Sequence, residues 1–413
     1  MRVFRRAFRF FRNTYFLPVL LLAVANLLLS GATTPTDSTR LLVAIADVHG
    51  DFNDFCSILQ RAGLIDEQRR WSGGKTTMVQ LGDLIDRGPQ PREVMDLMMS
   101  LEEQGAKAGG QVVALLGNHE VMNLMGDLRY VTAGNYASFA DSESEKRQKI
   151  ALQKYMAWRK DHAKLLAELY QPVLPETEAE WMTRHPLGFV EHRDAFGPKG
   201  MYGKWLRQRS AVAKIGGVVF LHGGINPELS SIGLDKINER IRSEIHQYDE
   251  TRGYLMDENV LLPFFTLQES LAVAQAELTA ERKQQAPSTE VRQARLLQFL
   301  ELGGWFCVRE DGPLWYRGYD QWGEEEGVSK VEKILGAYSA TNIVVGHTVQ
   351  KTAHIRSRFG GKIMLIDTGM LSSYYPGGKP SALEIDGDGK FTAVYLDQQV
   401  VLLDGKSAPS GLK

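Results

Sequence analysis

The chain has 413 residues, a formal net charge of −2 and 43% hydrophobic residues. A chain of this length can bury one large core or a core with an appended lobe, and its near-neutral charge does not support nonspecific nucleic-acid binding. Two cysteines, Cys56 and Cys307, are too few for a scaffold held together by disulfides. We predict that they either stay buried as thiols or pair with each other in an exported protein.

The N-terminal segment joins a basic stretch to an apolar run. Its first twelve residues hold five arginines and no acidic residue, the run 15–29 is largely apolar, and small residues follow at 30–32. This order is typical of a signal peptide, and the run is short of the about 20 apolar residues that a spanning helix needs. We predict a signal peptide over 1–32, with an uncleaved inner-membrane anchor as the alternative, and a linker over 33–40. The rest of the chain would then be periplasmic, secreted, or tethered to the inner membrane.

Five apolar runs rich in β-branched residues or leucine have the length of buried strands. They are 41–45, 78–81, 112–116, 218–221 and 343–345. A polar segment with at least one glycine follows each run, and the five segments are Asp47-Val48-His49-Gly50, Gly82-Asp83-Leu84-Ile85-Asp86-Arg87-Gly88, Gly117-Asn118-His119-Glu120, His222-Gly223-Gly224 and Gly346-His347-Thr348. Because open α/β sheets bind ligands beyond the carboxyl ends of their strands, we predict that these segments meet at one site. Carboxylates, an amide and imidazoles form a mixed oxygen and nitrogen ligand set for a metal.

Helical patterns occupy the intervals between these runs. Apolar residues recur at helical spacing in 51–62 and 91–104, so we predict one helix in each segment. Charged helical stretches at about 141–206 and 232–302 are predicted to be insertions. They could form a cap over the site or an ordinary helical layer packed on the sheets.

The last part of the chain returns to strand-like patterns. These runs are 362–366, 381–385 and 391–396. One catalytic domain is therefore predicted over 41–400, with a C-terminal tail over 401–413.

The order and composition of the polar segments resemble the calcineurin-like metallophosphoesterases. Gly-Asp-x-x-Asp-Arg-Gly and Gly-Asn-His-Glu are similar to the phosphoprotein phosphatase branch, and Gly312-Pro313-Leu314-Trp315-Tyr316-Arg317-Gly318 resembles the Shewanella-like protein phosphatases within it. The resemblance extends from Leu41 to about Gly369, and it departs from eukaryotic serine/threonine phosphatases at 367–375. It implies an α/β fold, namely the α-β-β-α sandwich of metallophosphoesterases with helical insertions.

The resemblance also implies two divalent metal ions, with manganese, iron or zinc as candidates, and six ligands. The implied ligands are Asp47 and His49 on the first metal, Asp83 between both metals, and Asn118, His222 and His347 on the second. A hydroxide between the metals is the implied nucleophile, because the cations lower the pKa of bound water.

Four further residues have implied catalytic roles. His119 would protonate the leaving oxygen, and Asp86 would orient it by accepting its other N–H. Arg87 and Arg317 would bind the phosphate oxygens, for which a planar guanidinium suits two contacts at once. Glu120 is expected to support its loop rather than bind metal.

Three functions agree with this reading of the residues. The favoured one is a metal-dependent phosphomonoesterase acting on phosphoprotein or phosphopeptide at serine, threonine or tyrosine. The alternatives are a periplasmic hydrolase of nucleotides or dinucleoside polyphosphates, and a noncatalytic scaffold that binds metal or phosphate. The predicted partners are a phosphoprotein, phosphopeptide or small phosphoester substrate, with no nucleic acid, and with a membrane only if the N-terminal segment stays attached.

Overall fold

The computed structural model describes residues 41–167, 173–283 and 289–405. The predicted signal peptide or anchor over 1–32 and the linker over 33–40 lie outside the described residues, as does the predicted tail from residue 406 onward. Within the described ranges, no helix is both long and apolar enough to cross a membrane.

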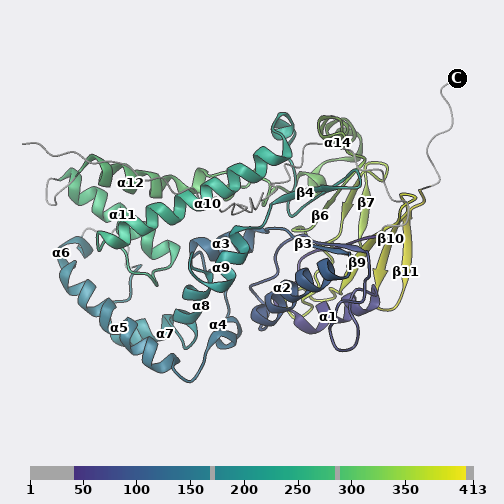
Figure 1. Ribbon diagram of the computed structural model, residues 1–413. Coiled ribbons are helices and arrows are strands. Elements are labelled where there is room, and N and C mark those ends of the chain that lie inside the picture. Colours follow the sequence, from purple (N-terminus) through teal and green to yellow (C-terminus); the bar gives the residue numbers. More distant parts are fainter. Residues whose placement is uncertain (1–40, 168–172, 284–288, 406–413) are drawn as a thin grey trace, which may run out of the picture. The chain divides into compact units, whose positions relative to one another are not determined.

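Two β-sheets carry the polar segments (Figure 1). The first has six strands in the order β11-β10-β9-β1-β2-β3. Their bounds are β1 Leu42–Ile45, β2 Thr77–Gln80, β3 Gln111–Ala114, β9 Ser381–Ile385, β10 Phe391–Tyr395 and β11 Gln399–Leu403. Strands β1, β2 and β3 run parallel, whereas β9 is antiparallel to β1.

The second sheet has five strands in the order β4-β5-β6-β8-β7. Their bounds are β4 Val212–Ile215, β5 Val218–Leu221, β6 Asn342–Val345, β7 Arg356–Arg358 and β8 Ile363–Leu365. Strands β5, β6 and β8 run parallel in its centre. Parallel strands end at the same sheet edge, so the segments after β5 and β6 are brought together.

Apolar side chains of both sheets form one shared core. Val79 of the first sheet and Phe220 and Val344 of the second belong to the same buried cluster. Because side chains alternate between the two faces of a strand, neighbouring residues such as Val43 and Val219 face the opposite way, into a second cluster that includes the helices.

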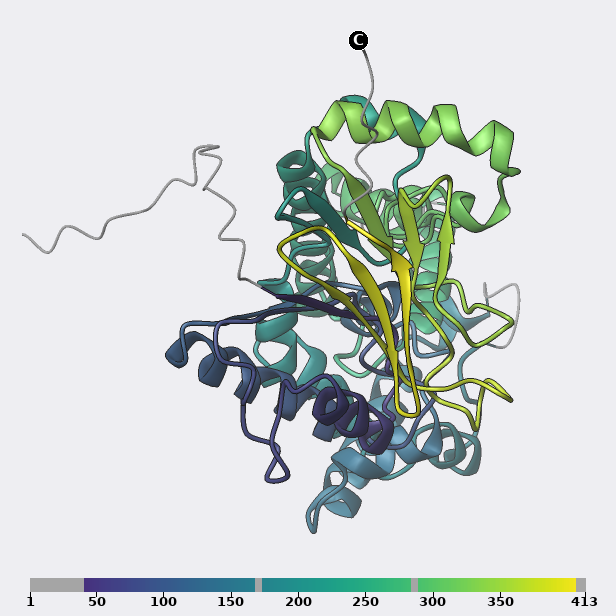
Figure 2. The same cartoon turned by 90° about the vertical axis from the view of Figure 1, so that its right-hand side faces the viewer.

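Helices cover the outer faces of the two sheets (Figure 2). Helix α1 (Phe52–Arg61) contacts β9 and β10, and α2 (Pro91–Lys107) contacts β3. Helix α1 begins after Asp51, whose carboxylate accepts the Asp54 N–H at 3.1 Å and so caps the helix. Helix α14 (Glu324–Tyr338) packs with the 3-10 helix η1 (Pro227–Ser231) beside the second sheet. The layers are those of the expected α-β-β-α sandwich.

The two predicted insertions contain helices that pack on one another. Contacts join α6 to α11 and α10 to α12, and the ring of Trp158 lies 5.0 Å from that of Phe265. We call α5–α8 and α10–α12 the helical lobe. The bounds of the helices in this region are α3 Asn118–Met125, α4 Ala133–Phe139, α5 Ser144–Asp161, α6 Ala163–Leu166, α7 Glu178–Arg184, α8 Phe189–Phe196, α9 Met201–Arg207, α10 Leu234–Asp257, α11 Leu267–Arg282 and α12 Glu290–Leu300.

Some elements go beyond the sequence-based expectation. The short strands β4 and β7 and the helices α13 (Gly318–Gln321), α14 and η2 (Glu301–Gly304) were not predicted. Strand β11 reaches Leu403, so the first sheet continues past residue 400, where the sequence predicts a tail. Its exposed valines do not alternate with polar residues, which removes the usual signal of a half-buried strand.

Candidate metal and phosphate site

The loops that follow β1, β2, β3, β5 and β6 carry the predicted ligands to one place. Several of these residues lie at sharp turns of the chain. His49, Asp83, Asp86, Arg87 and His347 all have positive φ, between 50° and 69°. Non-glycine residues rarely adopt this conformation, and it is concentrated at functional sites.

The predicted second-metal ligands surround His222. Its Nε2 lies 2.9 Å from Asn118 Oδ1, 3.0 Å from His347 Nδ1 and 3.2 Å from Asp83 Oδ2. The predicted first-metal ligands are more open: His49 Nε2 lies 3.7 Å from Asp47 Oδ2 and 3.8 Å from Asp83 Oδ2. Asp83 therefore contributes to both groups of donors, as expected of a ligand shared by two cations.

The three predicted histidine ligands are each fixed by a backbone carbonyl. Nδ1 of His49 donates to Ile85 O at 3.0 Å, and Nδ1 of His222 donates to Leu81 O at 3.0 Å. For His347 it is Nε2 that donates, to Trp315 O at 3.1 Å. The remaining ring nitrogen of each side chain faces the cluster, where its lone pair would bind a metal, which is the arrangement that metal-binding histidines show.

The cluster contains the buried carboxylates of Asp47 and Asp367, which nearby positive charge would stabilise. Burial raises the pKa of Asp47; the nearby His222 acts against this shift and Asp83 adds to it. Burial also holds the pKa of Asp367 well above its usual range, and the negative charge of Asp47 adds to that shift. One Asp367 oxygen accepts the Gly369 N–H at 3.0 Å, and the other has no partner among the described residues. A divalent cation would offset this charge, so the donor set fits divalent metals.

The imidazole of His222 responds to the same carboxylates. Burial alone would lower its pKa, but Asp83 and Asp47 outweigh burial and raise it to about 9. For Asp83, burial alone would raise the pKa. The neighbouring His222 and His119 outweigh burial, so the pKa of Asp83 lies well below its usual range. The negative charge of the site thus centres on Asp83.

Glu120 supports the loops instead of entering the metal cluster. Its Oε2 accepts the N–H groups of Asp83 at 2.7 Å and Gly117 at 2.8 Å, and its Oε1 accepts that of Leu84 at 2.9 Å. Gly117 is required here, because a Cβ on it would lie 2.2 Å from Asp83 Oδ1. One buried carboxylate therefore joins the second and third polar segments.

His119 and Asp86 form the predicted pair. Nδ1 of His119 donates to Asp86 Oδ2 at 2.7 Å, which leaves Nε2 on the side of Asp83, 3.8 Å from its Oδ2. Asn123 was not predicted to take part, yet its Nδ2 donates to the other Asp86 oxygen at 2.9 Å. Burial works against a charged His119, but Asp83 and Asp86 outweigh it and raise its pKa.

The two arginines line a cavity together with several of the predicted metal ligands. Arg317 Nη1 donates to His347 O at 2.9 Å and to Thr348 Oγ1 at 3.1 Å. Arg87 Nη1 donates to the hydroxyl of Tyr375 and to His49 Nε2. Both guanidinium groups therefore lie within the same small cavity as the predicted metal ligands.

That cavity has a volume of about 280 Å³ and a largely polar lining. Its walls combine predicted metal ligands with His119, both arginines and several aromatic side chains, and they consist of Asp47, Asp83, Arg87, Asn118, His119, Tyr130, Trp315, Arg317, His347, Thr348, Val349 and Tyr375. No residue of the helical lobe, in the part of the chain that the structure describes, lines it. The cavity walls therefore give no support to the expectation of a cap.

Sequence reasoning missed the aromatic residues around Arg87. The rings of Tyr130, Tyr374 and Tyr375 have their centroids 5.3, 4.8 and 5.4 Å from the Arg87 guanidinium carbon. They come from loops without periodic pattern, so no signal in the sequence marks them. Tyrosine rings at these distances attract a guanidinium through their negative faces.

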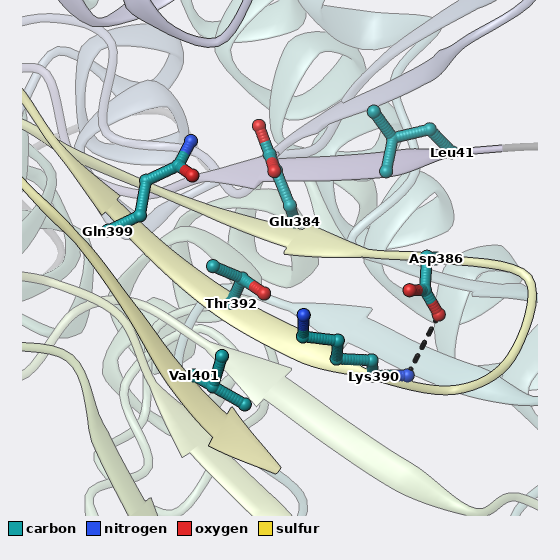
Figure 3. Close-up of a pocket in the computed structure, with 7 residues that line it drawn as sticks. All are labelled: Leu41, Glu384, Asp386, Lys390, Thr392, Gln399 and Val401. Atoms are coloured by element: carbon teal, nitrogen blue, oxygen red, sulfur yellow. Dashed lines mark hydrogen bonds between the residues drawn. The ribbon is translucent and has the colours of Figure 1, made fainter. Parts of the chain in front are cut away.

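A second hollow, of about 380 Å³, lies on the first sheet away from these residues (Figure 3). It is lined by residues of β9, β10 and β11 together with Leu41, and Asp386 and Lys390 belong to the turn between β9 and β10. It includes no predicted ligand.

Cys56 and Cys307 are both buried free thiols, so the predicted alternative of a disulfide between them is not formed.

Known proteins resemble this chain in sequence and in fold. Residues 41–265 match the calcineurin-like phosphoesterase family. The chain is 29% identical to an uncharacterized protein of Schizosaccharomyces pombe over 88% of this chain and 83% of that protein. It is 34% identical to Shewanella-like protein phosphatase 2 of Arabidopsis thaliana, over 52% of this chain and 54% of that one. The crystal structure of a cold-active protein-tyrosine phosphatase from a psychrophilic Shewanella superposes with a TM-score of 0.55 at 25% identity, covering 88% of this chain and 81% of that one.

Proposed function

Because the chain belongs to the calcineurin-like phosphoesterase family and is a phosphoester hydrolase, we propose that it removes phosphate from phosphoserine, phosphothreonine or phosphotyrosine in proteins or peptides. The observation that carries this proposal is the convergence of three kinds of group on one cavity. The shared carboxylate Asp83, the His119–Asp86 pair and the guanidinium groups of Arg87 and Arg317 all meet there.

The metal-binding role belongs to the six converging donors. Asp47, His49, Asp83, Asn118, His222 and His347 would hold the divalent ions. Bound metals would supply positive charge that activates water as the nucleophile and offsets the charge of the phosphoryl group. Asn118 contributes a neutral oxygen, which limits the negative charge that an incoming phosphate dianion meets.

The remaining residues act on the substrate. Arg87 and Arg317, which both line the cavity, bind and orient the phosphoryl oxygens. Nε2 of His119 donates a proton to the leaving oxygen, and Asp86 holds the ring in the orientation that this transfer needs. The positive charge of the two arginines stabilises the transition state, because negative charge develops on the leaving group there.

The walls of the cavity favour an aromatic phosphoester. The rings of Tyr130 and Tyr375 lie beside the Arg87 guanidinium, and Trp315 lines the same cavity with its ring 5.9 Å from that of His347. A phosphotyrosine ring can pack against such surfaces, whereas the shorter phosphoserine leaves them uncovered. The structural relative described as a protein-tyrosine phosphatase supports this preference.

The N-terminal segment supports a proposal about location. Its arginine-rich start and apolar run lead us to propose export to the periplasm, with cleavage near residue 32 or retention as a membrane anchor. Cell fractionation with N-terminal sequencing of the recovered protein tests this. Recovery of the intact chain in the cytoplasmic fraction would contradict it.

A substrate comparison tests the proposed function. Metal-depleted protein is supplied with manganese and given phosphotyrosine and phosphoserine peptides beside ATP, AMP and diadenosine tetraphosphate. We expect manganese-dependent release from the peptides, fastest from phosphotyrosine. A higher kcat/KM on the nucleotides would instead assign the same site to nucleotide turnover.

A further inference from the structure

Helix α3 carries three site residues at its first turn and receives support at its last. Asn118, His119 and Glu120 occupy the start of this eight-residue helix, and every residue in it is buried. A helix of this length is unstable by itself, and its last carbonyl groups need donors from elsewhere. The source of those donors therefore determines how firmly the site residues are held.

The helical lobe provides three such donors. Arg193 of α8 donates through Nη1 to Asn123 O at 3.1 Å, and the hydroxyl of Tyr248 in α10 donates to Met125 O. The N–H of Leu267, the first residue of α11, donates to Gly126 O at 2.7 Å. Contacts between α10 and α3 accompany these bonds (Figure 1). Segments that do not line the cavity thus fix the helix that does.

Arg193 is an unusual residue at this position. Its side chain is buried, and among the described residues its Nε has no hydrogen-bond partner. The guanidinium lies against Gly126, where an added Cβ would come within 2.7 Å of Nη2. The partial negative charge at the carboxyl end of α3 stabilises a cation placed there.

Asn123 connects this end of the helix to the proton donor. Its Nδ2 donates at 2.9 Å both to Asp86 Oδ1 and to the carbonyl of His119. Asp86 is consequently held at both oxygens, by Asn123 on one and by His119 on the other. A displaced Asn123 would leave Asp86 free to rotate away from His119.

We propose that Asn123 and Arg193 are positioning residues for proton transfer, with Arg193 anchoring the end of α3 and Asn123 holding the carboxylate that orients His119. This inference rests on the proposed function, because it assumes that His119 is the proton donor. The helical lobe would thus support the site through its hydrogen bonds to the carboxyl end of α3.

The test compares two esters that differ in their need for an acid. A p-nitrophenolate leaving group departs with little protonation, whereas phenolate benefits from it. For Asn123→Ala and Arg193→Met we expect kcat on phenyl phosphate to fall about 10- to 100-fold and kcat on p-nitrophenyl phosphate to fall about 3-fold or less. Arg193→Lys keeps a cation at the helix end and should recover part of the loss, and bound metal should stay at the wild-type level.

One control separates this role from a general loss of stability. Asn238→Ala removes a half-buried asparagine that bonds the backbone of Ala211 and Val212, and none of these three residues lines the cavity. It should lower the melting temperature without changing the ratio of the two ester rates. If Arg193→Met does not fold, Arg193→Lys and Asn123→Ser carry the same comparison.

The outcomes distinguish the inference from the function on which it rests. Wild-type protein without activity on either ester would overturn the proposed function. If His119→Ala changes the ratio of the two rates but the Asn123 and Arg193 variants leave it at the wild-type value, the positioning role is wrong and the proposed function stands.

Discussion

Nδ1 of His119 donates to Asp86 Oδ2 at 2.7 Å, and both side chains are buried. The bond fixes which ring nitrogen faces the cavity, because only Nε2 remains for the substrate. The same carboxylate is held on its other oxygen by Asn123. The fold therefore sets the orientation of the proposed proton donor before substrate enters.

The first prediction concerns this pair directly. His119→Ala should lower kcat on phenyl phosphate by about 10²- to 10⁴-fold, and on p-nitrophenyl phosphate by less, because its leaving group needs less protonation. Metal content, measured by plasma mass spectrometry, should be unchanged. Equal losses on the two esters would count against proton donation by His119.

The second prediction concerns the loop support by Glu120. Glu120→Gln turns one of its oxygens into an NH2 group that must face a backbone N–H of Asp83, Leu84 or Gly117. We expect the free energy of unfolding to drop by about 1–3 kcal/mol, the range for an unsatisfied buried donor. Urea unfolding measures this change.

Glu103→Gln is the matched control for that change. Glu103 is exposed on α2 and pairs with Lys107 at the surface. Exposed pairs contribute little to stability, so this variant should unfold like the wild type. Equal unfolding midpoints for the Glu120 and Glu103 variants would show that Glu120 does not hold the loops.

The third prediction concerns pH and a buried histidine of the lobe. The ring of His192 packs against those of Tyr136, Phe139 and Phe196 at 5.4, 5.0 and 4.6 Å. Burial, and then the neighbouring Arg193, lowers its pKa to about 3. In the unfolded chain the value is about 6.5, so the unfolded state binds the proton first as the pH falls.

Stability should therefore decrease from pH about 6.5 downward and continue to decrease toward pH about 3, by up to about 1.4 kcal/mol per pH unit. His192→Leu removes this contribution, so its unfolding free energy should change less between pH 7 and pH about 5 than that of the wild type. His246→Gln, at an exposed position, should keep the wild-type dependence. An unaltered dependence in His192→Leu would refute the prediction.

The fourth prediction concerns phosphate binding by Arg87. Lysine at this position keeps the charge but loses the planar group that lies among Tyr130, Tyr374 and Tyr375. Arg87→Lys should weaken inhibition by inorganic phosphate about 10- to 100-fold, which corresponds to the loss of one strong charged hydrogen bond. Inhibition constants measured on p-nitrophenyl phosphate give this number.

Arg129→Lys is the control for Arg87, because Arg129 is exposed and pairs with Asp127 outside the cavity. It should bind phosphate like the wild type. If both variants lose the same affinity, the loss does not come from contact between Arg87 and phosphate.

Much of the fold could be predicted because the relevant signals are local. Each central strand is a short apolar run stopped by a polar segment, and a run such as 218–221 is buried at every position. The polar segments follow strands whose ends meet in space, so the proximity of Asp83, Asn118 and His222 follows from strand order.

What could not be predicted depends on contacts between distant segments. Arg193 meets Asn123 across 70 residues, and no periodic pattern connects them. Tyr375 reaches the cavity from a segment whose sequence departs from that of eukaryotic serine/threonine phosphatases. Whether the lobe caps the cavity or packs behind it depends on how its helices dock, which the charge pattern of the helices does not specify.

The most direct test of the account is a metal titration that follows bound metal and p-nitrophenyl phosphate hydrolysis in the same samples. It uses metal-depleted wild-type protein, Asp83→Asn, and Asp141→Asn as a control at an exposed position that pairs with Arg147. We predict that wild-type and control activities rise with bound manganese, whereas folded Asp83→Asn binds less metal and is slower by about 100-fold or more. Full activity in metal-free protein, or wild-type activity and metal content in Asp83→Asn, would contradict the central claim.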